Sequence, residues 1–144
     1  MQESLRSPAI AVLVFALVAA CTSTSATARV EKILADMPAA SIDATPDALR
    51  ERFAAAKEIR ELGTRDRAFA QIALDAASTG QDNLCLETLR EVTHLRMRDD
   101  HAAKASLLRR RSGALAPARR IATMIADMQL RDAVFAALAT EVRS

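Results

Sequence analysis

The chain has 144 residues, of which 51% are hydrophobic, and a formal net charge of +2. It contains no Trp or Tyr, four Phe, three Gly and four Pro. A chain rich in Ala, Leu and Arg, with few aromatic and turn-forming residues, indicates one small all-α domain with a thin core, and argues against a β-sheet fold. The charge is uneven: residues 22–95 carry 9 basic and 12 acidic residues, and residues 96–144 carry 10 and 5.

The N-terminal stretch "MQESLRSPAIAVLVFALVAAC" contains an apolar run of 13 residues, from Pro8 to Ala20. A helix that spans a bilayer needs about 20 apolar residues. The short run, its position and the small residues that follow it therefore predict a secretory signal peptide at residues 1–20 rather than a permanent anchor.

The tetrapeptide Val18-Ala19-Ala20-Cys21 resembles the lipobox of bacterial lipoproteins. The resemblance implies that Cys21 is the lipidation residue, diacylated on its thiol and left as the new N-terminus after cleavage. Two or three acyl chains hold a protein firmly in a membrane, whereas one holds it only marginally. Thr22 follows the cysteine where Asp would signal retention, which for this class implies the outer membrane, facing the periplasm. An unmodified signal peptide is the alternative.

Residues 21–44 are expected to form a polar tether, "TSTSATA" at its start, followed by a short helix through Val30, Ile33 and Leu34. Cys85 is then the one thiol of the chain beyond the lipidated cysteine. An exported protein with a single thiol cannot form an internal disulfide. Cys85 is therefore either a buried small hydrophobe or a reactive thiol, and its place in the pattern described next favours burial.

The remaining chain, residues 45–144, repeats itself with a period of 33. The pair Arg-Asp begins at residues 65, 98 and 131, and Gly80 and Gly113 lie one period apart. Apolar positions follow the same spacing: Ile59, Val92 and Ile125; Leu62, Leu95 and Met128; Ala56, Leu89 and Ala122. Internal repetition at such a period is typical of stacked supersecondary units.

Each period predicts two helices. The first begins near Asp66 and ends at Gly80, and its apolar residues at i, i+3, i+4 and i+7 share one face. The second follows "QDN" and carries Cys85 and Leu89 on its apolar stripe. Upstream, Thr45 as N-cap and Pro46 in the first turn begin a helix that matches the second half of an incomplete unit. We therefore expect a short α-solenoid of antiparallel helix pairs.

The order of residues resembles the tetratricopeptide repeat, in Phe69, Ile72, Ala73, Ala76, Gly80 and Cys85. The resemblance implies a groove lined by the first helices, in which extended or helical peptides bind. The expected partner-binding residues lie between the core positions: Gln71, Leu74, Lys104, Leu107 and Arg110, with Arg67, Ala70 and Ala103 beside them. Apolar residues next to cations suit an acidic-hydrophobic segment. The alternative is that these side chains are solvated or pack between repeats.

The sequence has no enzyme signature and implies no cofactor: it lacks a phosphate-binding glycine loop, a zinc-binding His-Glu helix and a nucleophile elbow. His94 and His101 flank a helical turn beside Asp99 and Asp100, but this spacing matches no metal-ligand set, so no metal site is expected. No nucleic acid partner is expected, because no Trp or Tyr is present to stack on bases. The recurrent Asp of the Arg-Asp pairs is expected to stabilise helix starts.

The sequence thus predicts an outer-membrane-anchored periplasmic lipoprotein whose helical repeats bind another protein, with an accessory or scaffold role in an envelope complex. The acylated Cys21 is its contact with the membrane. The alternative is a self-associating structural lipoprotein without a peptide-binding groove, because the apolar face of the last helix, from Phe135 to Val142, is left uncovered.

Overall fold

The computed structural model describes residues 25–37 and 44–140, and these are all-helical, as the composition predicts. The predicted signal peptide, Cys21 and the first residues of the tether lie outside the described residues, as does Val142. No helix in the described ranges has the length and apolar character needed to cross a bilayer.

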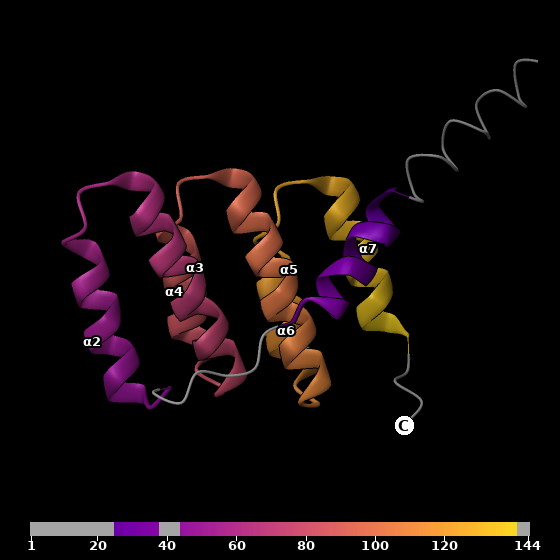
Figure 1. Cartoon of the computed structure of the whole chain (residues 1–144). Helices are drawn as coiled ribbons and strands as arrows, with labels where there is room; N and C mark the ends of the chain where they lie inside the picture. The colour runs from indigo at the N-terminus through magenta and orange to yellow at the C-terminus, as the bar shows by residue number, and fades with distance from the viewer. Residues whose placement is uncertain (1–24, 38–43, 141–144) are drawn as a thin grey trace, which may run out of the picture.

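A helical segment at residues 25–35 comes first. Six helices follow it: α2 (Pro46–Lys57), α3 (Leu62–Ser78), α4 (Asp82–Glu91), α5 (Leu95–Arg111), α6 (Leu115–Ala122) and α7 (Met128–Ala139). α3 packs on α4 and α5 packs on α6, as antiparallel pairs (Figure 1). We call α3, α5 and α7 the first helices and α2, α4 and α6 the second helices. First helices begin 33 residues apart and pack on one another in a row, α3 on α5 and α5 on α7.

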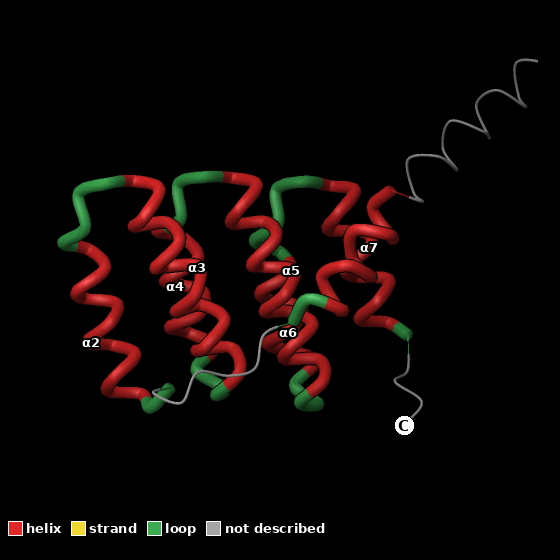
Figure 2. Tube along the Cα trace, viewed as in Figure 1, coloured by secondary structure: helices red, strands yellow, loops and turns green. Residues whose placement is uncertain are grey.

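Local sequence explains where the helices begin and end. The Thr45 side chain accepts a hydrogen bond from Ala48 N, with Pro46 as the first helical residue of α2, as predicted. Gly80 and Gly113 follow α3 and α5 with φ angles of 81° and 80°. This left-handed conformation is costly for a residue with a Cβ and is common just after a helix end. The loops that precede α3, α5 and α7 consequently lie along one edge of the molecule (Figure 2).

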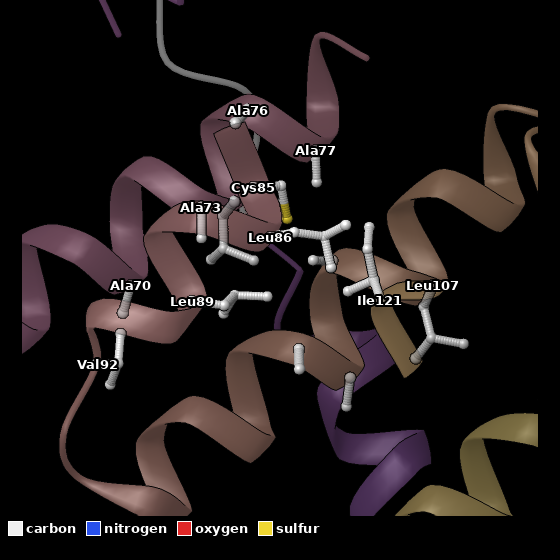
Figure 3. Close-up of a cluster of buried hydrophobic side chains, with 14 of the residues drawn as sticks. Ala70, Ala73, Ala76, Ala77, Cys85, Leu86, Leu89, Val92, Leu107 and Ile121 are labelled. Atoms are coloured by element: carbon white, nitrogen blue, oxygen red, sulfur yellow. The ribbon is translucent and has the colours of Figure 1, made fainter. Parts of the chain in front are cut away.

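The core consists mainly of Ala, Leu, Ile and Val side chains contributed by successive helices (Figure 3). Cys85 lies in this core between Ala76 and Leu89, fully buried, which confirms the expectation for this residue. Burial raises the pKa of its thiol to about 12, and the nearby Asp82 carboxylate adds to the shift. The thiol is therefore protonated and enclosed, a state in which cysteine is unreactive.

The recurrent aspartates have a different role from the predicted one. α3 begins at Leu62, so Asp66 lies inside the helix and does not cap its start. Its buried carboxylate instead accepts hydrogen bonds from Thr93 N (3.1 Å), Thr93 Oγ1 (2.8 Å) and His94 N (2.8 Å), in the loop before α5. Burial raises the pKa of Asp66, but these hydrogen bonds outweigh it and leave the pKa below its usual value.

Asp99 makes the same contact one period later. It accepts hydrogen bonds from Ala126 N (3.0 Å) and Asp127 N (2.9 Å), in the loop before α7. The aspartates of the first two Arg-Asp pairs therefore each join one first helix to the loop that begins the next one. We call this contact the aspartate clamp.

We predict that Asp66→Ala lowers the free energy of unfolding by about 2 kcal/mol, because backbone N–H groups lose a charged acceptor. Asp132→Ala is the matched control. Asp132 is the equivalent residue of α7, is exposed and has no hydrogen bond or ion pair among the described residues. In dilute protein its effect should stay within about 0.5 kcal/mol. Urea-induced unfolding of the full chain measures both, and equal effects would contradict the clamp.

Candidate functional site: the face of the first helices

The helix at residues 25–35 docks on the first helices, next to α7 (Figure 1). The Arg29 guanidinium makes two hydrogen bonds to Asp100 Oδ1 on α5, from Nη2 (2.7 Å) and Nε (3.0 Å). Its Nη1 donates a third to Asp127 Oδ2, just before α7 (3.0 Å). Val30 and Ile33, one helical turn apart, are buried in the common core. The predicted short helix is therefore present, and it belongs to the folded unit.

A hollow of about 450 Å³ remains between this helix and α5. Lys32 and Asp36 line it from the docked helix, and Met97, His101 and Lys104 line it from α5. His101 Nδ1 lies 2.8 Å from Met97 O. Burial lowers the pKa of His101, an effect that the Lys104 charge reinforces and that the Met97 hydrogen bond and Asp100 oppose. A neutral imidazole that donates to the carbonyl is therefore favoured next to the docked helix.

The structure corrects the expected apolar strip of the groove. Leu74 and Leu107 are only 4% and 3% exposed, and Ala70 and Ala103 are buried as well. The reason is that each complete first helix packs on two neighbours, its own second helix and the next first helix. Its buried surface is therefore wider than one helical stripe, and these leucines belong to the core.

The polar members of the expected set lie in three different environments. Gln71 is exposed and donates from its side-chain amide to Asp75 Oδ1 (3.0 Å). Lys104 is half-buried beside the docked helix, and Arg110 donates to Thr140 O (3.0 Å), which holds it against the end of α7. Gln71 and Lys104 thus lie on the face that receives the docked helix or continues it.

The same face is uncovered one repeat earlier. Asp100 and Lys104, which meet the docked helix, correspond at a spacing of 33 residues to Arg67 and Gln71 on α3, and both of these are exposed. Arg67 makes a hydrogen bond only to Thr64 Oγ1 within its own helix, at 3.2 Å. The face of the first helices therefore has an occupied part over α5 and α7 and a free part over α3.

The remaining histidine has a local role, because the His94 ring accepts a hydrogen bond from Met97 N (3.2 Å) as N-cap of α5. Among the described residues no group of three or more His, Cys, Asp or Glu is arranged to hold a metal ion. Comparison of the chain with protein-family models, curated proteins and solved structures found no match. Arg29 is the site residue that sequence reasoning missed, because its partners lie 71 and 98 residues away.

We predict that Arg29→Ala releases residues 25–35 from the repeats, because it removes three charge-assisted hydrogen bonds that together outweigh the loss of any single apolar contact. Hydrogen exchange of the backbone amides of residues 29–35 should accelerate at least about tenfold, while α3 and α4 stay protected. Lys32→Ala, an exposed neighbour without an ion pair, is the control. Unchanged exchange in Arg29→Ala would contradict the role given to this side chain.

Proposed function

We propose that the chain is an outer-membrane lipoprotein of the periplasm whose tetratricopeptide-like repeats bind another protein, as an accessory or scaffold subunit of an envelope complex. The observation that carries the protein-binding part is the docked helix at residues 25–35. The face of the first helices receives an amphipathic helix through two buried aliphatic residues and an arginine. Helix-in-groove recognition uses this combination of apolar anchors and polar contacts.

The free part of that face is the proposed partner site. Arg67 is exposed there, and Arg52 on α2 lies nearby with 35% of its side chain exposed and paired to the buried Asp75 (2.8 Å). Lys104 adds a third positive charge at the border with the docked helix. Three cations around an open helical face favour a partner segment with acidic side chains, and complementary charge mainly sets specificity and the rate of association.

The membrane part of the proposal rests on the lipobox resemblance at Cys21. Ser25, the first described residue, is four positions beyond this cysteine, and four extended residues reach at most about 14 Å. Because the helix that follows is docked on α5 and α7, an acylated Cys21 would hold that end of the repeats close to the membrane surface. Confinement near the membrane raises the effective concentration toward partners located there.

The lipid attachment has a direct test. Intact-mass measurement of the protein purified from membranes should give a chain that begins at Cys21 and carries the mass of its acyl chains. The Cys21→Ser variant should keep residues 1–20 and lose the acyl mass. A wild-type chain that begins elsewhere, or that carries an unmodified Cys21, would contradict the proposal.

Partner binding is tested by affinity capture from cross-linked envelopes with wild type and the double variant Arg67→Glu with Lys104→Glu. The expected result is at least a tenfold loss of the partner in the double variant, because two charge contacts become repulsive. Arg90→Glu with Arg119→Glu is the matched control, since both arginines are exposed on second helices. Equal loss in both double variants would show a dependence on net charge alone and overturn the assignment of this face.

A further inference from the structure

The outer side of α7 leaves open several positions that are buried in the preceding first helices. Asp132 is exposed, whereas its equivalents Asp66 and Asp99 are only 3% and 4% exposed. The same contrast holds for two alanines, named with their buried equivalents: Ala136 with Ala103 and Ala70, and Ala139 with Ser106 and Ala73. In the complete repeats these positions are covered by a second helix and by the next first helix. Within the described residues α7 has neither.

At the other end of the row, α2 is a second helix without a first helix on its inner side. Ala55 is exposed and Ile59 is half-buried, whereas their equivalents in the complete repeats are buried: Thr88 and Ile121 for Ala55, and Val92 and Ile125 for Ile59. A shallow hollow of about 520 Å³, mostly apolar, lies there between α2 and α3, with Ala68 and Gln71 on its α3 side. Its position corresponds to that of a first helix, which in each complete repeat packs on its own second helix and on the next first helix.

The two ends are also complementary in hydrogen bonding. The loop that precedes α3 contains Arg60 and Glu61, equivalent to Thr93 and His94 at the spacing of 33. The backbone N–H groups of Arg60 and Glu61 donate to no acceptor in the described part of the chain. At the opposite end the Asp132 carboxylate accepts no hydrogen bond there either. The chain thus displays half of an aspartate clamp at each end, the acceptor on α7 and the donors before α3.

We propose that two copies of the chain associate head to tail, with α7 of one copy packed on α2 and α3 of the next. Each contact completes one helix pair, α7 supplying the first helix and α2 the second. Asp132 of one copy then accepts hydrogen bonds from the Arg60 and Glu61 N–H groups of the other, as Asp66 and Asp99 do within the chain. The contact joins two different surfaces, so it is heterologous and leaves one free end of each kind.

The charges at the contact are compatible with this arrangement. Arg52 occupies the position of the buried Cys85 and Ala118, which makes it the least expected residue of the α2 surface. Its guanidinium is already paired with the Asp75 carboxylate at 2.8 Å, so docking of α7 buries no unpaired charge there. The contact uses the ends of the row, whereas the proposed partner site uses the face around Arg67. The two proposals therefore fail independently.

The test uses site-specific cross-linking between two variants of the full chain in detergent, both carrying Cys21→Ser. One has Ala136→Cys and the other Ala55→Cys, and both positions are exposed. Cys85 is buried with its pKa raised to about 12, so the introduced cysteines are the reactive ones. A short bifunctional maleimide should give cross-linked dimers in the mixture and none in either variant alone. A protein with both substitutions should give a ladder of larger products.

Asp132→Asn in the Ala136→Cys protein should reduce dimer formation at least about tenfold, because a charged acceptor is lost from the contact. Glu87→Gln, an exposed carboxylate on α4, is the matched control and should change nothing. Cross-linking of each variant with itself would show a symmetric contact and overturn the proposal, as would the absence of dimers at all concentrations. Protection of both cysteines by a different envelope protein would assign these ends to that protein and overturn it as well.

Discussion

The aspartate clamp is the constraint on which the arrangement of the repeats depends. A buried carboxylate on one first helix, Asp66 or Asp99, binds two backbone N–H groups in the loop that begins the next first helix. Those N–H groups lie at a turn where no helix or strand supplies an acceptor, so the side chain satisfies them. The contact spans 27 and 28 residues, and it thereby fixes the distance and the direction from each repeat to its neighbour. Alanine-rich packing supplies the contact area around it, but small apolar side chains alone specify position weakly.

A unit built from such nearest-neighbour contacts has two unfinished ends, and the chain treats its surfaces differently. The face over α5 and α7 is covered by its own helix at residues 25–35, held through Arg29, while the face over α3 and both ends of the row stay open. An open face with positive charge suits a partner from the envelope, and two complementary ends suit a second copy. Both proposals describe a membrane-anchored scaffold, in which the repeats hold other molecules and carry no chemistry of their own.

Local sequence signals predicted the local structure well: the Thr45 cap, the turns at Gly80 and Gly113 and the burial of Cys85 are all present. The misassigned residues are those whose environment depends on a second neighbour. A helical period identifies one apolar stripe, so Leu74 was assigned to the groove although it is buried. The Arg-Asp repetition was visible, but the partner of the carboxylate lies a whole repeat away, and no local pattern marks it. Arg29 and its two carboxylates are farther apart still and became visible only in the fold.

Amide hydrogen exchange of the full chain, followed residue by residue at low and high protein concentration, tests the central claim most directly. The account predicts slow exchange for the clamped amides of Thr93, His94, Ala126 and Asp127 at both concentrations. The amides of Arg60 and Glu61 should exchange fast in dilute protein and slow down as copies associate, and Asp132→Asn should abolish this slowing. Fast exchange at Thr93 and His94 would contradict the clamp itself, and fast exchange at Arg60 and Glu61 at every concentration would contradict its completion by a second copy.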